Sequence, residues 1–103
     1  MTERRVLVQQ FVDKYPQFAP GWLLFSRVAE SSQERLKAIE RGLAANPDRD
    51  TKGMLLLNKA MALDGSGDGA AAVELLRTLS ADPESTHATE ALAKAMLEQV
   101  SNK

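Results

Sequence analysis

The chain has 103 residues, a formal net charge of -1 and no cysteine. This length suits one small domain, and the near balance of 13 basic and 14 acidic residues argues against a globally basic nucleic-acid binder. The lack of cysteine excludes a disulfide scaffold, a thiolate metal site and a cysteine nucleophile. No apolar run approaches the roughly 18 residues of a membrane-spanning helix, and the apolar stretch at 6–8 is too short for a signal peptide. We therefore expect no membrane insertion and a cytoplasmic location.

The composition favours helices. The chain contains 15 Ala and 14 Leu but only six Val and one Ile. Ala and Leu lose little conformational entropy in a helix, whereas strands are enriched in β-branched residues. We therefore expect an all-α fold of about six helices.

Proline, glycine and serine mark the boundaries of the expected helices. Pro16 ends the first helix, and Pro20 suits the first turn of the second. Ser31 followed by Glu34 is a capping box for the third helix. A glycine-rich turn at 64–69 separates the fourth helix from the fifth. The predicted helices cover, in chain order, residues 3–14, 20–30, 33–45, 51–63, 70–80 and 85–100.

The chain also contains an internal repeat. Three predicted helices end in similar tripeptides, whose prolines are 31 and 36 residues apart. The mean of these spacings is close to the roughly 34-residue period of the tetratricopeptide repeat. Two of the helices that open a hairpin contain similar spaced motifs. The tripeptides are Lys14-Tyr15-Pro16, Ala45-Asn46-Pro47 and Ala81-Asp82-Pro83, and the spaced motifs are Trp22-x2-Phe25-Ser26-x2-Ala29 and Met54-x2-Leu57-Asn58-x2-Met61.

Over nearly the whole chain these features resemble the tetratricopeptide-repeat family, and a generic helical bundle is the alternative. The resemblance implies one domain, 1–103, built as a short right-handed solenoid of stacked antiparallel helical hairpins. Each hairpin would bury its apolar face against the next one. The parts would be a lone N-terminal helix (1–16), a first repeat (17–49), a second repeat (50–84) and a C-terminal capping helix (85–103).

The resemblance also implies a concave groove lined by the first helix of each hairpin. Arg27, Lys59 and Lys94 occupy equivalent positions in the aligned repeats and would form a basic stripe there. Cations beside apolar side chains suit an extended peptide with acidic groups or a free carboxylate. The full predicted peptide-binding groove comprises Leu23, Arg27, Lys52, Leu55, Lys59, His87 and Lys94.

We therefore expect a protein-interaction module with a protein or peptide partner, which would carry acidic groups. The alternative is a structural or self-associating fragment of a larger tetratricopeptide protein. The first helix favours self-association, because Leu7 and Phe11 are more apolar than a solvent-facing terminal helix needs. A homo-oligomer is thus a second possible assembly.

No motif predicts catalysis. His87 is the single histidine, and no partner pattern for a triad or a metal site accompanies it. Residues 64–69 begin like a calcium loop, but Leu75 stands where the bidentate carboxylate should be. We therefore expect no enzymatic activity, no metal and no cofactor. Nucleic-acid binding is disfavoured as well, because aromatic side chains for base stacking are scarce.

Overall fold

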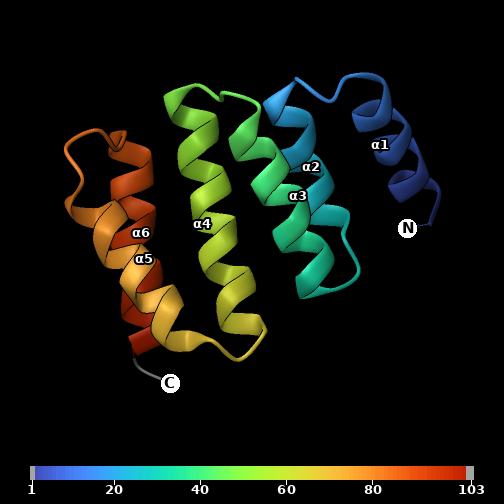
Figure 1. Cartoon of the computed structure of the whole chain (residues 1–103). Helices are drawn as coiled ribbons and strands as arrows, with labels where there is room; N and C mark the ends of the chain where they lie inside the picture. Colours follow the sequence, from blue (N-terminus) through green and yellow to red (C-terminus); the bar gives the residue numbers. More distant parts are fainter. Residues whose placement is uncertain (1, 102–103) are drawn as a thin grey trace.

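In a computed structural model that describes residues 2–101, the chain is all-helical, as predicted (Figure 1). Each helix begins and ends within two residues of its expected bounds. Residues 1 and 102–103 of the predicted domain lie outside the described residues. The helices are α1 (Thr2–Lys14), α2 (Ala19–Val28), α3 (Ser32–Ala44), α4 (Arg49–Gly65), α5 (Gly69–Ala81) and α6 (His87–Ser101).

Side-chain caps explain where several helices begin. The Ser31 hydroxyl accepts a hydrogen bond from the Glu34 N–H at 3.1 Å, so the predicted cap of α3 is present. The carboxylate of Asp48 accepts from the Thr51 N–H at 2.7 Å and caps α4 in the same way. At the start of α2 a proline takes the place of a side-chain cap, as the sequence indicated for Pro20.

The end of α4 corrects one detail of the prediction. We expected residues 64–69 to be a non-helical turn, but α4 continues through Gly65 and α5 already begins at Gly69. Gly67 has a positive φ of 95°. Its N–H bonds to the Asp64 carbonyl, and the next N–H, of Asp68, bonds to the Leu63 carbonyl at 2.8 Å. These two bonds form a Schellman cap, which allows the chain to reverse within three residues.

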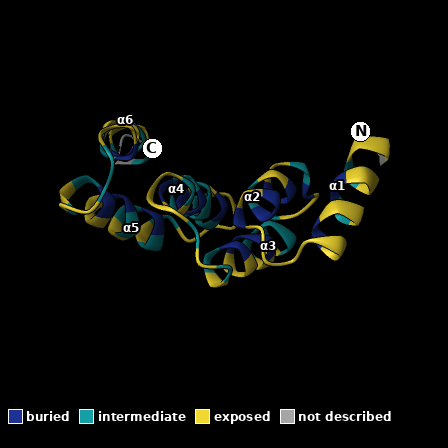
Figure 2. Cartoon of the chain, turned by 90° about the horizontal axis from the view of Figure 1, so that it is seen from above, coloured by how far each residue is buried: buried dark blue, intermediate teal, exposed yellow. Residues whose placement is uncertain are grey.

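The helices form a row in which each contacts the next. Their backbones are in contact between sequence neighbours, and α4 also contacts both α2 and α6. Within the described residues, α3 makes no backbone contact with α1 or with α5. Seen from above, α3 and α5 lie on one side of the row and α2 and α6 on the other, with α4 between them (Figure 2). The result is a flat molecule with extents of 37 × 27 × 18 Å.

The buried side chains form one cluster at each end of the row, and the α3–α4 contact joins them. Leu55 of α4 is fully buried against Gly42 of α3 at this junction, and Ile39 of α3 is fully buried as well. The N-terminal cluster contains Val8, Val12, Trp22, Phe25 and Ala38. The C-terminal cluster contains Leu57, Ala60, Ala72, Leu76, Leu79 and Ala93.

Two glycines permit close helix contacts around α4. A Cβ atom added at Gly42 would lie 2.9 Å from Cδ2 of Leu55, so α3 and α4 approach closely at this point. A Cβ atom added at Gly53 would overlap the hydroxyl of Thr89 on α6. Helix α4 therefore needs glycine where α6 crosses it.

None of the described helices combines the length and the apolar character needed to span a membrane.

Candidate interaction surfaces

A small hollow between α2 and α4 combines a cation with exposed apolar surface. We call it the α2/α4 hollow; its volume is about 160 Å³. Met61 is 60% exposed at its edge. Arg27 is exposed on the α2 side and has no ion pair among the described residues. The hollow thus offers a thioether side chain and an unpaired guanidinium to a ligand.

The floor of this hollow is polar and held by hydrogen bonds. Ser26 is fully buried, and its hydroxyl donates to the Leu23 carbonyl at 2.6 Å. Asn58 of α4 donates to the same hydroxyl oxygen at 3.4 Å and so connects α4 to α2. Arg35 donates to the carbonyls of Ser26 (3.0 Å) and Ala29 (3.4 Å), which would otherwise be unsatisfied at the end of α2. The floor is therefore fixed before any ligand arrives.

Lys59 does not lie beside Arg27, contrary to the predicted basic stripe. The Lys59 ammonium is 2.9 Å from the carboxylate of Glu40 on α3. Adjacent residues of a helix lie about 100° apart around its axis, and the neighbour of Lys59, Asn58, faces α2. Lys94 forms a separate pair with Glu90 of its own helix, at 3.3 Å. The structure therefore does not bring the three cations together as one free column.

Leu55 corrects a second part of the predicted groove. We expected it to contact a bound peptide, but it is fully buried and packs over Gly42. Met61 is the exposed residue of the spaced motif, whereas Leu57 is buried and Met54 packs against the C-terminal cluster. Leu55 and Leu57 lie about 200° apart around the axis of α4 and are both buried, because α4 contacts four other helices.

The other predicted groove residues are distributed over α2, α4 and α6. Leu23 is half-buried on α2, next to the exposed Leu24. Lys52 is exposed and lines a hollow near Leu79 at the start of α4. His87 is exposed at the first residue of α6. Of the seven predicted residues, only Arg27 lines the α2/α4 hollow, and Leu23 contacts its floor.

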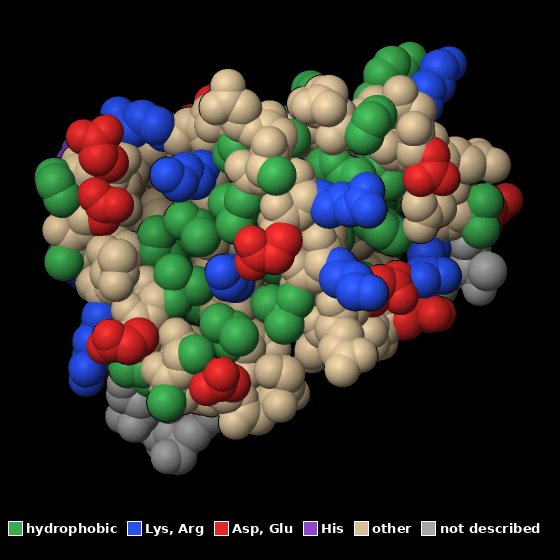
Figure 3. Space-filling model, in the orientation of Figure 1, with side chains coloured by type: hydrophobic (Ala, Val, Ile, Leu, Met, Phe, Trp, Pro, Cys, Tyr) green, Lys and Arg blue, Asp and Glu red, His purple; other side chains and the backbone are tan. Residues whose placement is uncertain are grey.

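The face formed by α3 and α5 carries further apolar surface. Figure 3 shows this side of the molecule, with α3 and α5 in front of α4. Hydrophobic side chains gather between the two helices, and basic and acidic side chains meet among them. The half-buried Leu56 and Leu63 of α4 pack against the C-terminal cluster. Most of this apolar surface is thus an extension of the core.

The residues predicted for self-association lie on an exposed aromatic surface at the N-terminal end of the row. Leu7 is 62% and Phe11 40% exposed. The Phe11 ring lies 5.1 Å from that of Tyr15 and 5.9 Å from that of Phe18, measured between centroids. We call the four side chains Leu7, Phe11, Tyr15 and Phe18 the aromatic edge. Exposed large apolar side chains are concentrated here, which is typical of an interaction surface.

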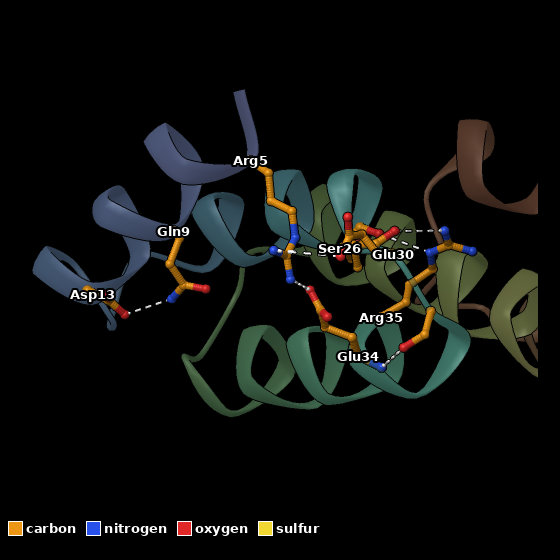
Figure 4. A network of polar contacts seen from close by, with 9 residues as sticks. Arg5, Gln9, Asp13, Ser26, Glu30, Glu34 and Arg35 are labelled. Atoms are coloured by element: carbon orange, nitrogen blue, oxygen red, sulfur yellow. Dashed lines mark hydrogen bonds and ion pairs between the residues drawn. The ribbon is translucent and has the colours of Figure 1, made fainter. Parts of the chain in front are cut away.

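A polar network links α1 to α3 and was not predicted from the sequence (Figure 4). The guanidinium of Arg5 donates to the Glu34 carboxylate, and it lies 3.8 Å from that of Glu30. The hydrogen bond to Glu34 is the main influence that raises the pKa of Arg5 above its ordinary value. Further along α1, Gln9 donates to Asp13 at 2.9 Å. Residues 29 positions apart meet here, and no local pattern could reveal such a contact.

The acidic turn and the histidine show no metal-site geometry. Among the described residues, no group of three or more His, Asp or Glu side chains is placed to hold a metal ion. The Asp68 carboxylate instead accepts a hydrogen bond from the Ala71 N–H at 3.2 Å and caps α5. A structural role therefore accounts for this carboxylate of the turn.

No model of a known protein family matches the chain, and no curated protein or solved structure matches it either. Any function assigned to the chain therefore rests on its own residues and geometry.

Proposed function

We propose that the chain is a tetratricopeptide-like protein-interaction module, and that its α2/α4 hollow binds an extended, acidic peptide segment of a partner. The observation that carries this proposal is the position of the unpaired Arg27 and the exposed Met61 on either side of a hydrogen-bonded floor. An apolar partner side chain would cover Met61, and a partner carboxylate would pair with Arg27.

The arrangement of the helices supports the tetratricopeptide-like part of the proposal. A groove lined by the first helices of successive hairpins requires those helices to be neighbours, and α4 contacts both α2 and α6. The second helices, α3 and α5, lie together on the opposite side. The prolines at the ends of the repeats and this alternation of sides are independent features that favour the same architecture.

Apolar contact would supply most of the affinity in this site. Met61 and the half-buried Leu23 offer apolar surface at the hollow. Burial of such surface contributes roughly 25 cal/mol per Å². The exposed Arg27 would mainly set the register of the peptide and speed its association, since exposed ion pairs contribute only about 0–1 kcal/mol.

Selection from a displayed library of random peptides tests the proposal. We expect the wild-type chain to enrich peptides with Asp or Glu near an apolar residue. Their affinity should fall by about tenfold or more in Arg27→Glu and in Met61→Glu, because each change removes one side of the site and adds a repelling carboxylate. Arg77→Glu, an exposed charge change on α5, is the matched control and should bind normally. If every selected peptide bound Arg27→Glu as tightly as the wild type, the site would be excluded.

The aromatic edge favours a second function, self-association of the chain. Leu7, Phe11, Tyr15 and Phe18 are all at least 40% exposed on one end of the row. A second copy that covered them would remove a large apolar area from water.

The absence of enzymatic activity and the cytoplasmic location both stay predictions from the sequence.

A further inference from the structure

We propose that the chain has a second binding site, a cleft between α1 and α3 that takes a partner peptide in which a carboxylate lies next to an apolar side chain. This α1/α3 cleft is separate from the α2/α4 hollow and shares no lining residue with it. Its volume is about 430 Å³, within the range of roughly 300–1,000 Å³ that is common for ligand sites.

The cleft exists because α1 and α3 both pack on α2 without touching each other through their backbones. At one end the Arg5–Glu34 hydrogen bond crosses between the two helices (Figure 4). The floor consists of Trp22 and Phe25 of α2, whose ring centroids are 6.0 Å apart. The Trp22 indole N–H donates to the Pro16 carbonyl at 2.9 Å, which fixes the ring. The floor is therefore rigid, and the two rings, which are 6% and 7% exposed, present only their edges of apolar surface to the cleft.

The charges of the cleft are only partly compensated. Glu34 is paired with the cation Arg5, whereas Asp13 accepts only from the neutral amide of Gln9 and keeps its negative charge. Two cations of α3, Lys37 and Arg41, have no carboxylate partner among the described residues. They lie one helical turn apart and share a face.

Arg41 also links the charge to the floor. Its guanidinium carbon lies 5.4 Å from the centre of the Trp22 ring, in a cation–π contact. A carboxylate that bound Arg41 and Lys37 would therefore lie close to the indole. An apolar side chain next to that carboxylate would reach Trp22 and Phe25.

This pattern selects a singly charged carboxylate over a phosphate-rich ligand. A polyphosphate or a nucleic-acid backbone would bring several negative charges close to Asp13 and Glu34, which would repel it. A Glu or Asp side chain needs only the pair Lys37 and Arg41, and peptides supply an apolar neighbour for it. We infer that a segment with a single acidic residue flanked by apolar residues fits the cleft.

Trp22 makes the test direct, because it is the only tryptophan in the chain. The probe is the blocked peptide acetyl-Leu-Leu-Glu-Leu-Leu-amide, titrated against the tryptophan emission of the full chain. We expect a saturable change in emission. The apparent Kd should rise about tenfold or more for the matched peptide with Gln in place of Glu, and equally in Lys37→Glu and Arg41→Glu. Circular dichroism verifies that both variants are folded, and the exposed Arg77→Glu should bind as the wild type does.

Further arms separate this site from the α2/α4 hollow and from other ligands. Arg27→Glu and Met61→Glu should leave the titration unchanged, so the two sites can fail independently. Arg41→Lys should weaken binding less than Arg41→Glu, because it keeps the charge and loses the planar contact. The proposal is overturned if the Glu and Gln peptides bind equally or if Lys37→Glu has no effect. It is also overturned if emission does not change up to about 1 mM peptide, because a Kd of about 1 mM corresponds to a binding free energy of only about 4 kcal/mol. Equal saturation by free acetate would identify a small-anion site and overturn the peptide assignment.

Discussion

Lys59 of α4 and Glu40 of α3 form an ion pair, with Nζ and Oε2 2.9 Å apart. This contact directs Lys59 toward α3, whereas Asn58 bonds to Ser26 on α2. The charge of Lys59 therefore serves the contact between α3 and α4. Arg27 remains as an exposed cation beside the α2/α4 hollow, with no ion pair among the described residues.

The first prediction concerns this pair. Lys59→Met should leave peptide binding in the α2/α4 hollow unchanged and should alter the free energy of unfolding by no more than about 1 kcal/mol, because both side chains are partly exposed. Urea denaturation measures the stability, and the peptides selected on the wild type measure the binding. Loss of binding as large as in Arg27→Glu would return Lys59 to the site.

The second prediction concerns Leu55. Leu55→Ala should destabilise the chain by about 2–5 kcal/mol, since it opens a cavity at the fully buried contact with Gly42. Leu24→Ala, at a side chain that is 39% exposed, is the control and should cost far less. If Leu55→Ala does not fold, Leu55→Met keeps most of the volume and should lose less than about 1.5 kcal/mol. Equal stabilities of Leu55→Ala and Leu24→Ala would contradict the buried position.

The third prediction concerns the crossing of α4 and α6. Helix propensity alone would favour Gly53→Ala by about 1 kcal/mol. We expect the opposite sign, because the added Cβ would overlap the Thr89 hydroxyl. Gly65→Ala, also in α4, meets only an ordinary contact of 3.5 Å with Ser32 and should not destabilise.

A double-mutant cycle with Thr89→Ala checks the cause. The combined variant should recover part of the stability that Gly53→Ala loses, because the overlapping hydroxyl is gone. Thermal unfolding of the four proteins gives the coupling. Strictly additive effects would show that these two residues do not meet.

The fourth prediction concerns pH. The hydrogen bond from the Thr51 N–H lowers the pKa of Asp48 below its ordinary value. The unfolded carboxyl therefore takes up its proton at a higher pH than the folded one. The cap is fully stabilising above about pH 4 and is lost as the pH falls through the lower, folded pKa.

Asp48→Asn separates this titration from the rest of the chain. Its amide oxygen keeps an acceptor for the Thr51 N–H but does not take up a proton at low pH. We expect the wild type to lose more stability than Asp48→Asn between about pH 5 and pH 2.5, measured as the urea midpoint. Parallel curves for the two proteins would mean that the Asp48 cap does not titrate in this way.

The fifth prediction concerns the aromatic edge. If this surface mediates self-association, the mass from sedimentation equilibrium should rise with concentration for the wild type. The double variant with Ser in place of Leu7 and Phe18 should stay monomeric, because these are the most exposed members of the edge. Phe11 is unsuitable for this test, since its ring also packs against Gly21. A mass that does not depend on concentration in the wild type would exclude self-association over the range tested.

The helices themselves could be predicted from the sequence. Ala and Leu dominate it, Pro16, Pro47 and Pro83 follow the ends of helices, and Pro20 lies in the first turn of one. These are local effects of backbone entropy and proline geometry, which act whatever the tertiary contacts are. The cap at Ser31 is equally local, because its hydroxyl reaches an N–H only three residues away.

Only the tertiary structure decided which faces of the helices are exposed. Residues 54–57 of α4 are all apolar, and α4 is enclosed by α2, α3, α5 and α6, so periodicity cannot select its free face. Leu55 and Leu57 lie about 200° apart around the axis of α4, yet both are buried, whereas Met61 is exposed. The α1/α3 cleft likewise depends on two helices that meet only through side chains, across a third. Contacts between distant residues created these surfaces, and such contacts leave no periodic signal in the sequence.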